Sequence, residues 1–314
     1  MKNVLVTGAT GFVGRALLER IATDGIHFPV AGSRREAAVT KRGEALIPPL
    51  GPLADFSQAL TDISIVVHTA ARAHILQDEV VDPLDEYRQI NVDGTRNLAR
   101  QAAAAGVKRF IFISSIGVNG NINTRPFTEN DSPNPAEPYA QSKWEAEQGV
   151  WEIQAATGME VVIIRPPLVY GPGAPGNFGR LVAWVEKSVP LPLGAIHNNR
   201  SLIALDNLID LIITCLDHPA AANEVFLAGD GEDLSTTELL RGVAKAMGKP
   251  SRLIPVPAGF LMAGASLLGK KAMAQRLLGS LQVDISKAQT VLGWQPPRTV
   301  EQGLKRCFAP RSEA

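Results

Sequence analysis

The sequence predicts an α/β protein with a doubly wound parallel sheet and a smaller C-terminal substrate-binding lobe. Through the first half of the chain, short apolar strands alternate with helical stretches, and this order produces a parallel sheet covered by helices on both faces. A glycine-rich turn joins the first strand to the first helix with the spacing that receives a dinucleotide. With 314 residues, the chain is long enough for one large domain and a smaller one.

The order of the elements follows from the hydrophobic pattern. The first strand is expected at 4–6 and is followed by a helical stripe at 16–21. Further strands are expected to end at 30–32 and to span 63–68, 109–114 and 160–165, with helices at 92–105 and 139–157. After Pro166 prolines and glycines mark loops, and helices are expected at 206–216 and 236–247. We therefore predict a dinucleotide-binding domain at 1–167, which 200–228 rejoins, and a lobe formed by 168–199 and 229–314.

The glycines of the first turn have distinct expected roles. Gly8 makes the tight turn, Gly11 lets the backbone approach phosphate oxygens, and Gly14 lets the helix pack closely on the strand. Free amides at the start of the helix then face the anion. An ordinary strand–turn–helix unit can carry the same glycines. The apolar strand before them and the helical stripe after them favour a nucleotide site.

Composition limits the possible partners. The chain has 31 basic and 31 acidic residues and no basic cluster, so nothing favours nucleic acid. Cys215 and Cys307 have no paired spacing, which favours reduced thiols, and no metal-ligand spacing is present. The chain enters a strand after 1–3 without a signal peptide, so we expect a cytoplasmic enzyme with no integral membrane segment. The apolar stretch 257–268 is too short to span a bilayer and precedes two lysines; we expect a packing helix, with peripheral membrane contact as the alternative.

Tyr139 and Lys143 are the candidate catalytic pair. They stand four residues apart near the start of a predicted helix, so their side chains project from the same side. A neighbouring ammonium group favours the phenolate, which would bring the tyrosine pKa from about 10 towards working pH. Ser115, at the end of a predicted strand, could hydrogen-bond the same reacting oxygen. Chance also produces a Tyr-x-x-x-Lys spacing, and the combination with the glycine turn and Ser115 is what favours catalysis.

Several motifs together resemble the extended short-chain dehydrogenase/reductases, of the NAD-dependent epimerase/dehydratase type. The resemblance covers essentially the whole chain and rests on Thr7-Gly8-x-x-Gly11-x-x-Gly14, His68-Thr-Ala-Ala71, Asn91, Ser114-Ser115, Tyr139-x-x-x-Lys143 and Arg165-Pro-Pro-Leu-Val-Tyr-Gly-Pro172. It implies a Rossmann sheet that holds NAD or NADP and a C-terminal lobe that holds a nucleotide-sugar. Members of that family mostly oxidise, reduce, epimerise or dehydrate nucleotide-sugars.

The resemblance also implies roles for individual residues. Tyr139 would be the general acid/base, Lys143 would bind the nicotinamide ribose, and Ser115 would polarise the sugar oxygen. The implied cofactor contacts are Gly8, Thr10, Gly11, Phe12, Val13, Gly14, Ser33, Arg34, Arg35, Leu53, Thr69, Ala70, Ala71, Asn91, Ser114, Tyr139, Lys143, Pro166 and Val169. The implied substrate contacts are Arg72, His74, Ser115, Asn177, Phe178 and Arg200. A homodimer through the helices at 92–105 and 139–157 is also implied.

Departures from the family pattern narrow the chemistry. Ser115 is followed by Ile116-Gly117-Val118 and lacks the Asp-Glu pair of the dehydratases, so dehydration is disfavoured. The second strand ends in Gly32-Ser33-Arg34-Arg35, without the acidic residue that binds an adenosine ribose. Arginines there can bind a 2′-phosphate, which favours NADP(H) over NAD(H), although a solvated loop would also carry them.

Three functions remain from the sequence. The runs at 114–120, 165–170 and 229–238 resemble a bacterial surface-polysaccharide subgroup. On that basis the leading hypothesis is reduction, by NADPH, of the C4 keto group of a UDP-4-keto-6-deoxy-N-acetylhexosamine for O-antigen synthesis. The alternative is a UDP-hexose or UDP-N-acetylhexosamine 4-epimerase with bound NAD. A non-catalytic, NADPH-responsive binding protein is the third hypothesis, which the presence of both Tyr139 and Lys143 disfavours.

Overall fold

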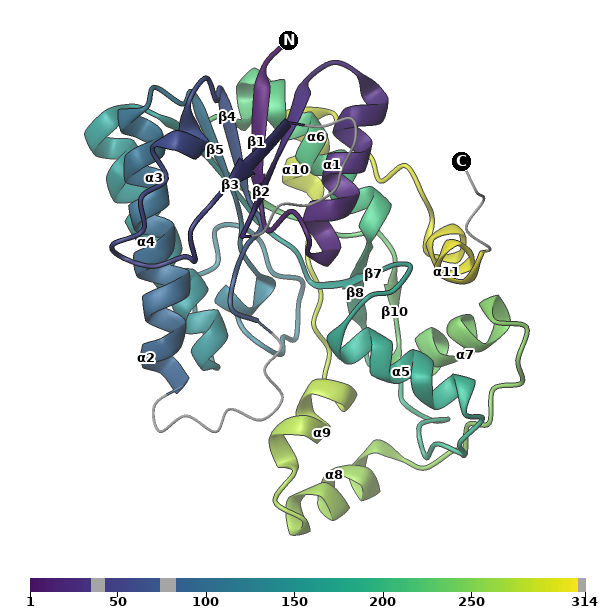
Figure 1. The fold of residues 1–314 in the computed structure, drawn as a ribbon. Coiled ribbons are helices and arrows are strands. Elements are labelled where there is room, and N and C mark those ends of the chain that lie inside the picture. Colours follow the sequence, from purple (N-terminus) through teal and green to yellow (C-terminus); the bar gives the residue numbers. More distant parts are fainter. Residues whose placement is uncertain (35–42, 74–82, 310–314) are drawn as a thin grey trace.

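A seven-stranded sheet forms the centre of the protein (Figure 1). The computed structural model describes residues 1–34, 43–73 and 83–309. The strand order is β3-β2-β1-β4-β5-β6-β9, and each neighbouring pair is parallel. The bounds are β1 Asn3–Thr7, β2 Phe28–Ser33, β3 Gly43–Leu46, β4 Ile65–His68, β5 Arg109–Ile113, β6 Glu160–Arg165 and β9 Glu224–Leu227. The predicted doubly wound parallel sheet is confirmed, and its order reverses between β1 and β4, where such sheets bind ligands.

Helices cover both faces of this sheet (Figure 1). On one face, α1 (Phe12–Asp24), α6 (Leu205–Asp217) and α10 (Ser286–Leu292) pack on Val4 and Val6. On the other, α3 (Gly94–Ala104) and α4 (Pro138–Thr157) pack on Leu5. Successive strand residues point to opposite faces, and both faces are apolar because both are covered. The remaining short helices around the sheet are α2 (Pro83–Tyr87), the π-helix η2 (Arg88–Asp93) and the 3₁₀-helices η1 (Gln58–Leu60), η3 (Ile116–Val118) and η4 (Pro219–Ala221).

A second lobe is built around a three-stranded sheet of order β10-β8-β7. Its strands are β7 (Leu168–Tyr170), β8 (Arg200–Ala204) and β10 (Asp233–Leu234), and its helices are α5 (Gly176–Glu186), α7 (Thr236–Ala246), α8 (Ala258–Leu267), α9 (Lys271–Leu278) and α11 (Val300–Phe308). A separate apolar core that includes Tyr170, Phe178 and Leu240 holds the lobe together. The domain boundaries stay a prediction, although β9 lies beside β6 in the large sheet.

The apolar stretch expected to be a packing helix forms α8, yet none of the residues of α8 is fully buried. Only part of one side, including Ala258 and Leu261, touches the lobe core. The helix therefore packs through the side that carries Ala258 and Leu261 and against α9, and its other side is exposed. None of the helices in the described parts of the chain is long and apolar enough to cross a membrane.

The turn after β1 has the geometry that its glycines predict. Gly8 has φ +71°, a conformation that favours glycine. A Cβ on Gly14 would lie 2.2 Å from the Gly8 carbonyl oxygen, so helix α1 approaches the turn more closely than any side chain permits. The expected roles of a tight turn at Gly8 and close packing at Gly14 are confirmed.

We predict that Gly14→Ala lowers the free energy of unfolding by about 2–3 kcal/mol, because the new methyl group meets rigid backbone. Urea unfolding of the purified protein measures this. The matched control is Gly264→Ala in α8, where a Cβ meets none of the described atoms within 4 Å. That control should be neutral or stabilising by up to about 1 kcal/mol. Equal unfolding midpoints for the two variants would contradict the close-packing account.

Candidate active site

The first turn of α1 forms a cradle that fits a pyrophosphate. The helix begins after Gly11, and no described side chain caps its first amides. Its first turn also carries no acidic residue, so the partial positive charge of the helix end is not neutralised. Beside it, the Thr69 hydroxyl donates to the Thr7 carbonyl oxygen at 2.7 Å, which joins the ends of β4 and β1. The residues therefore fit the dinucleotide that the sequence predicts.

Ser115 lies just past the end of β5, where it begins the 3₁₀-helix η3. Its half-buried hydroxyl accepts a hydrogen bond from the Gly117 amide at 3.1 Å. A Cβ built on Gly117 would lie 3.3 Å from Ser115 Oγ and 3.1 Å from Ala140 Cβ. Ser115 and the first turn of α4 are thus close neighbours across Gly117, so the fold brings Ser115 near the helix that carries Tyr139 and Lys143.

Lys143 is held in an apolar environment on α4. Its side chain is 2% exposed, and its ammonium nitrogen lies 3.9 Å from the centroid of the Phe112 ring. Burial lowers the pKa of Lys143 to about 7, against the opposing attraction of Glu147 one turn later. His68 stacks on the same Phe112 ring. Burial, and then the charge of Lys143, lower the pKa of His68 to about 3. His68 is therefore neutral.

Tyr139 corrects one expectation from the sequence. The spacing suggested that Lys143 would bring its pKa down towards neutrality. Instead, burial, and then repulsion from the Tyr87 phenol, raise the pKa of Tyr139 to about 12. The main cause is burial, which disfavours the charged phenolate. In the protein alone, Tyr139 is a proton donor.

A buried ion pair lies beneath the catalytic candidates. Glu147 is 0% exposed and accepts from the Arg165 guanidinium at 3.0 and 2.5 Å. The Ser114 hydroxyl donates to Glu147, and Arg165 also donates to Asn119 Oδ1 at 3.0 Å. This network connects α4 to the ends of β5 and β6 and to η3. Sequence reasoning missed Glu147, although its i+4 spacing from Lys143 is visible in the chain.

Asn91, expected to contact the cofactor, has a structural role in the protein alone. It lies in the π-helix η2 and is 2% exposed. Its amide accepts from the Arg72 backbone N–H at 2.8 Å and donates to the Arg72 carbonyl and to Ser142 Oγ. It therefore ties the segment after β4 to α4, so its expected contact with the cofactor stays a prediction.

Arg72 reaches towards the catalytic tyrosine through Tyr87. The guanidinium of Arg72 lies 5.6 Å from the Tyr87 ring centroid and pairs with Glu86 at 2.9 Å. The Tyr87 ring in turn meets the Tyr139 ring edge-on at 6.1 Å. Tyr87 was not predicted, because no local motif marks it and only the fold brings it to Tyr139. The expected contact of Arg72 with the substrate stays a prediction.

The other expected cofactor residues lie on several elements of the protein. Ala70 and Ala71 follow β4 next to Gly8, Ser33 ends β2, and Leu53 is 96% exposed. Of the remainder, Thr10, Phe12 and Val13 belong to the first turn and helix α1, Arg34 is exposed after β2, Pro166 is buried after β6, and Val169 lies on β7. Arg35 and His74, also expected at the site, lie outside the described residues. The individual contacts stay predictions.

The expected substrate residues of the lobe differ in accessibility. Asn177 is exposed at the start of α5 and accepts a hydrogen bond from Arg180. The Phe178 side chain is 1% exposed and packs 5.6 Å from the Tyr170 ring centroid, so it is a core residue. Arg200 donates to the carbonyl oxygens of Arg276 and Gly279 at 2.7 and 3.1 Å, and burial lowers its pKa.

The lobe also contacts the segment that leads to Tyr139. Arg276 pairs with Glu137 at 2.6 Å, two residues before the tyrosine.

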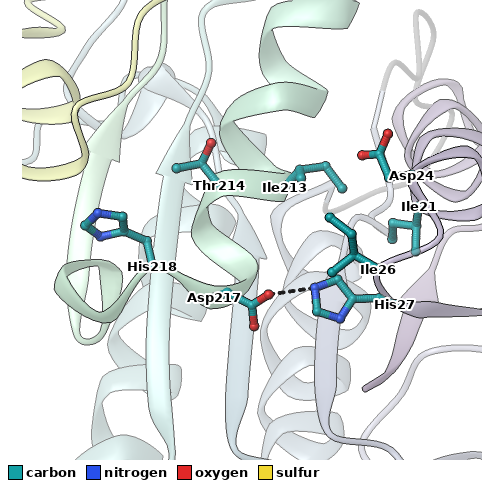
Figure 2. Close-up of a pocket in the computed structure, with 8 residues that line it drawn as sticks. All are labelled: Ile21, Asp24, Ile26, His27, Ile213, Thr214, Asp217 and His218. Carbon is teal, nitrogen blue, oxygen red and sulfur yellow. Dashed lines mark ion pairs between the residues drawn. The ribbon is translucent and has the colours of Figure 1, made fainter. Parts of the chain in front are cut away.

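A cavity of about 360 Å³ lies elsewhere, between the C-terminal ends of α1 and α6 (Figure 2). It is lined by residues such as Ile26 and by His27, which pairs with Asp217 at 2.7 Å. Helix α1 begins at the glycine turn and runs back towards the N-terminal ends of the strands. This cavity therefore lies at the N-terminal ends of the strands, away from the candidate site.

The fold and the site together define a Rossmann-type α/β protein with the serine, tyrosine and lysine of a dehydrogenase/reductase. The sequence model of the NAD dependent epimerase/dehydratase family matches residues 4–229. The chain belongs to this family, as the resemblance of its motifs predicted.

The relatives and solved structures are similar over nearly their whole length. The UDP-glucose 4-epimerase of Vibrio cholerae is 45% identical over 311 residues, which cover 97% of this chain and 94% of the relative. The N-acetyl-alpha-D-glucosaminyl-diphospho-ditrans,octacis-undecaprenol 4-epimerase of Escherichia coli O157:H7 is 31% identical, covering 97% and 93%. The UDP-N-acetylglucosamine 4-epimerase structure from Bacillus cereus has a TM-score of 0.79 at 20% identity over 98% of each chain. The structural likeness shows the shared fold.

We predict that Glu147→Gln lowers the free energy of unfolding by about 3–5 kcal/mol, because it leaves the Arg165 guanidinium buried without a counter-charge. The control is Glu152→Gln on the same helix, whose exposed pair with Arg96 at 2.6 Å is worth less than about 1 kcal/mol. Denaturant unfolding compares the two variants. A similar small loss in both would mean that the buried pair does not hold the site together.

Lys143→Met should stabilise the nucleotide-free protein at pH 7 by about 2–4 kcal/mol, because it removes a buried ammonium group. The folded-state pKa of about 7 lies below the ordinary value of 10.5. Between these values the unfolded chain binds more protons, so wild-type stability rises with pH across that window. The variant should lack this rise.

Melting temperatures at pH 7, 8 and 9 test the lysine prediction, with the exposed Lys245→Met as the control that should follow the wild type. Tyr139 does not interfere, because its raised pKa of about 12 affects stability only above pH 10. If Lys143→Met and wild type give parallel curves, Lys143 keeps its ordinary pKa.

Proposed function

We propose that this protein is a 4-epimerase of a UDP-hexose or UDP-N-acetylhexosamine that works with NAD. The observation that carries the proposal is the 45% identity to a UDP-glucose 4-epimerase over nearly the whole of both chains. Other support comes from the candidate site, where Ser115 lies near Ala140 in the first turn of α4, the helix that carries Tyr139 and Lys143. A solved UDP-glucuronic acid 4-epimerase of the same fold, at 22% identity and a TM-score of 0.78, contains NAD.

The residues of the chain divide the proposed work between them. The glycine turn would hold NAD, which would supply the hydride acceptor and donor needed to invert C4 of the sugar. Tyr139 takes the proton of the C4 hydroxyl as the hydride leaves and gives it back when the hydride returns. Ser115 donates a hydrogen bond to the same oxygen and stabilises its negative charge. The cradle at Gly8, Gly11 and Gly14 holds the pyrophosphate.

The protonation states decide how this cycle begins. Burial keeps Tyr139 protonated in the protein alone, which is the form needed to protonate a 4-keto sugar during its reduction. To take a proton from the C4 hydroxyl, Tyr139 must first release its own proton to solvent, and a nearby cation is needed to stabilise the phenolate that results. Lys143 is one turn away on the same helix and, when protonated, supplies that charge.

We predict that the wild-type protein interconverts UDP-glucose or UDP-N-acetylglucosamine with its C4 epimer without added reductant. Tyr139→Phe should lower kcat at least about 1000-fold, because it removes the proton carrier. Proton NMR of the sugar nucleotides measures the conversion, and Tyr87→Phe is a matched control that changes a neighbouring phenol. Equal loss in both variants, or unchanged turnover in Tyr139→Phe, would contradict the assignment. No turnover of these sugar nucleotides, together with no consumption of NADPH on the 4-keto sugar of the second candidate below, would favour a non-catalytic binding protein.

A second candidate is the NADPH-dependent reduction of a UDP-4-keto-6-deoxy-N-acetylhexosamine for O-antigen synthesis. The observation that favours it is the end of β2, where Ser33 is followed by the exposed Arg34 in place of an acidic residue. Protein-dependent loss of NADPH absorbance with that substrate, and its slowing in Arg34→Ala, would select this candidate. The homodimer and the cytoplasmic location stay predictions.

A further inference from the structure

Helix α8 presents an apolar stripe to solvent. Phe260, Leu267 and Leu268 are 74%, 89% and 74% exposed. Together with Gly264, they occupy positions i, i+4, i+7 and i+8, which share one face of a helix. Ala258 and Leu261 on the other side touch the lobe core, so the helix is anchored while its outer face is open. Single exposed apolar residues are ordinary, but an aligned group on one helix indicates a contact surface.

The charge around this stripe has a single sign. Residues 249–283 contain five basic residues and no acidic residue, although the whole chain has a net charge of zero. Lys270 and Lys271 are exposed and directly follow the stripe. Among the ion pairs of the described residues, neither lysine has a carboxylate partner, whereas Arg276 pairs with Glu137. Exposed apolar side chains beside basic ones are the pattern of a helix that lies in the surface of an anionic bilayer.

The position of the stripe connects it with the candidate site. Helices α8 and α9 form a pair at the end of the lobe far from the N-terminus (Figure 1). The C-terminal end of α9 accepts hydrogen bonds from Arg200, and its Arg276 pairs with Glu137 next to Tyr139. A surface that bound α8 would therefore contact the lobe whose helix α9 pairs with Glu137, two residues before Tyr139.

We propose that α8 docks the enzyme reversibly on an anionic phospholipid surface, with Phe260, Leu267 and Leu268 in the interface and Lys270 and Lys271 against the head groups. This goes beyond the proposed function, which needs no membrane. The contact is peripheral, since a ten-residue helix enters only the boundary between head groups and acyl chains.

Cosedimentation of the full-length protein with vesicles tests the proposal. The wild type should bind vesicles of phosphatidylglycerol and phosphatidylcholine but not of phosphatidylcholine alone, and high salt should weaken binding. Both Phe260→Ser/Leu267→Ser and Lys270→Glu/Lys271→Glu should reduce the partition coefficient at least about tenfold. The matched control is Ile26→Ser/Lys108→Glu, which makes the same kinds of change at exposed positions on the large domain and should bind like the wild type.

Three results would overturn the proposal. The first is no binding of wild type to the anionic vesicles, and the second is unchanged binding of either α8 variant. The third is a change in the sedimentation mass of an α8 variant without lipid, because the stripe would then cover a second copy of the chain. Circular dichroism and epimerase turnover in solution check that each variant folds. Turnover is measured without vesicles, so failure of docking is distinct from failure of the proposed function.

Discussion

The buried pair of Glu147 and Arg165 is the interaction on which the site depends. Two charges are removed from water at the junction of α4, β5 and β6, and they are tolerated because each is hydrogen-bonded further, to Ser114 and to Asn119. The pair fixes the helix that carries Tyr139 and Lys143 against the strand end that carries Ser115. Ser115 and the Tyr139–Lys143 pair, which lie on separate elements, are thereby brought together.

Burial also sets the protonation states of Tyr139 and Lys143. The same apolar setting lowers the pKa of Lys143 to about 7 and raises that of Tyr139 to about 12, so the pair holds less charge in the protein alone than its spacing suggests. A site that disfavours charge before it is filled gains most from a ligand that supplies compensating charge or hydrogen bonds. Burying Lys143 lowers the stability of the protein alone, and it also leaves a lysine whose protonation can change when a ligand binds.

Much of this arrangement could be predicted from the sequence, for reasons that differ by residue. The parallel sheet and the turn at Gly8 and Gly14 come from local patterns, an apolar strand run and a glycine spacing, which the structure keeps. The short strands β3 and β9 and the small second sheet have too few residues to show a period. Tyr87 lies next to Tyr139 only because of the tertiary fold, so no local motif could predict it. The raised pKa of Tyr139 comes from burial, which residue spacing does not reveal. The exposed face of α8 is likewise a property of the fold.

The most direct measurement is the fate of the hydrogen at C4. In the proposed epimerase reaction, one hydride would leave the sugar and return to the same carbon within one site. UDP-glucose carrying deuterium at C4 should therefore give a C4 epimer that keeps all of its deuterium, with none in water or in an added pool of free NAD. Loss of the label to solvent or to that pool during epimerisation would contradict the central claim.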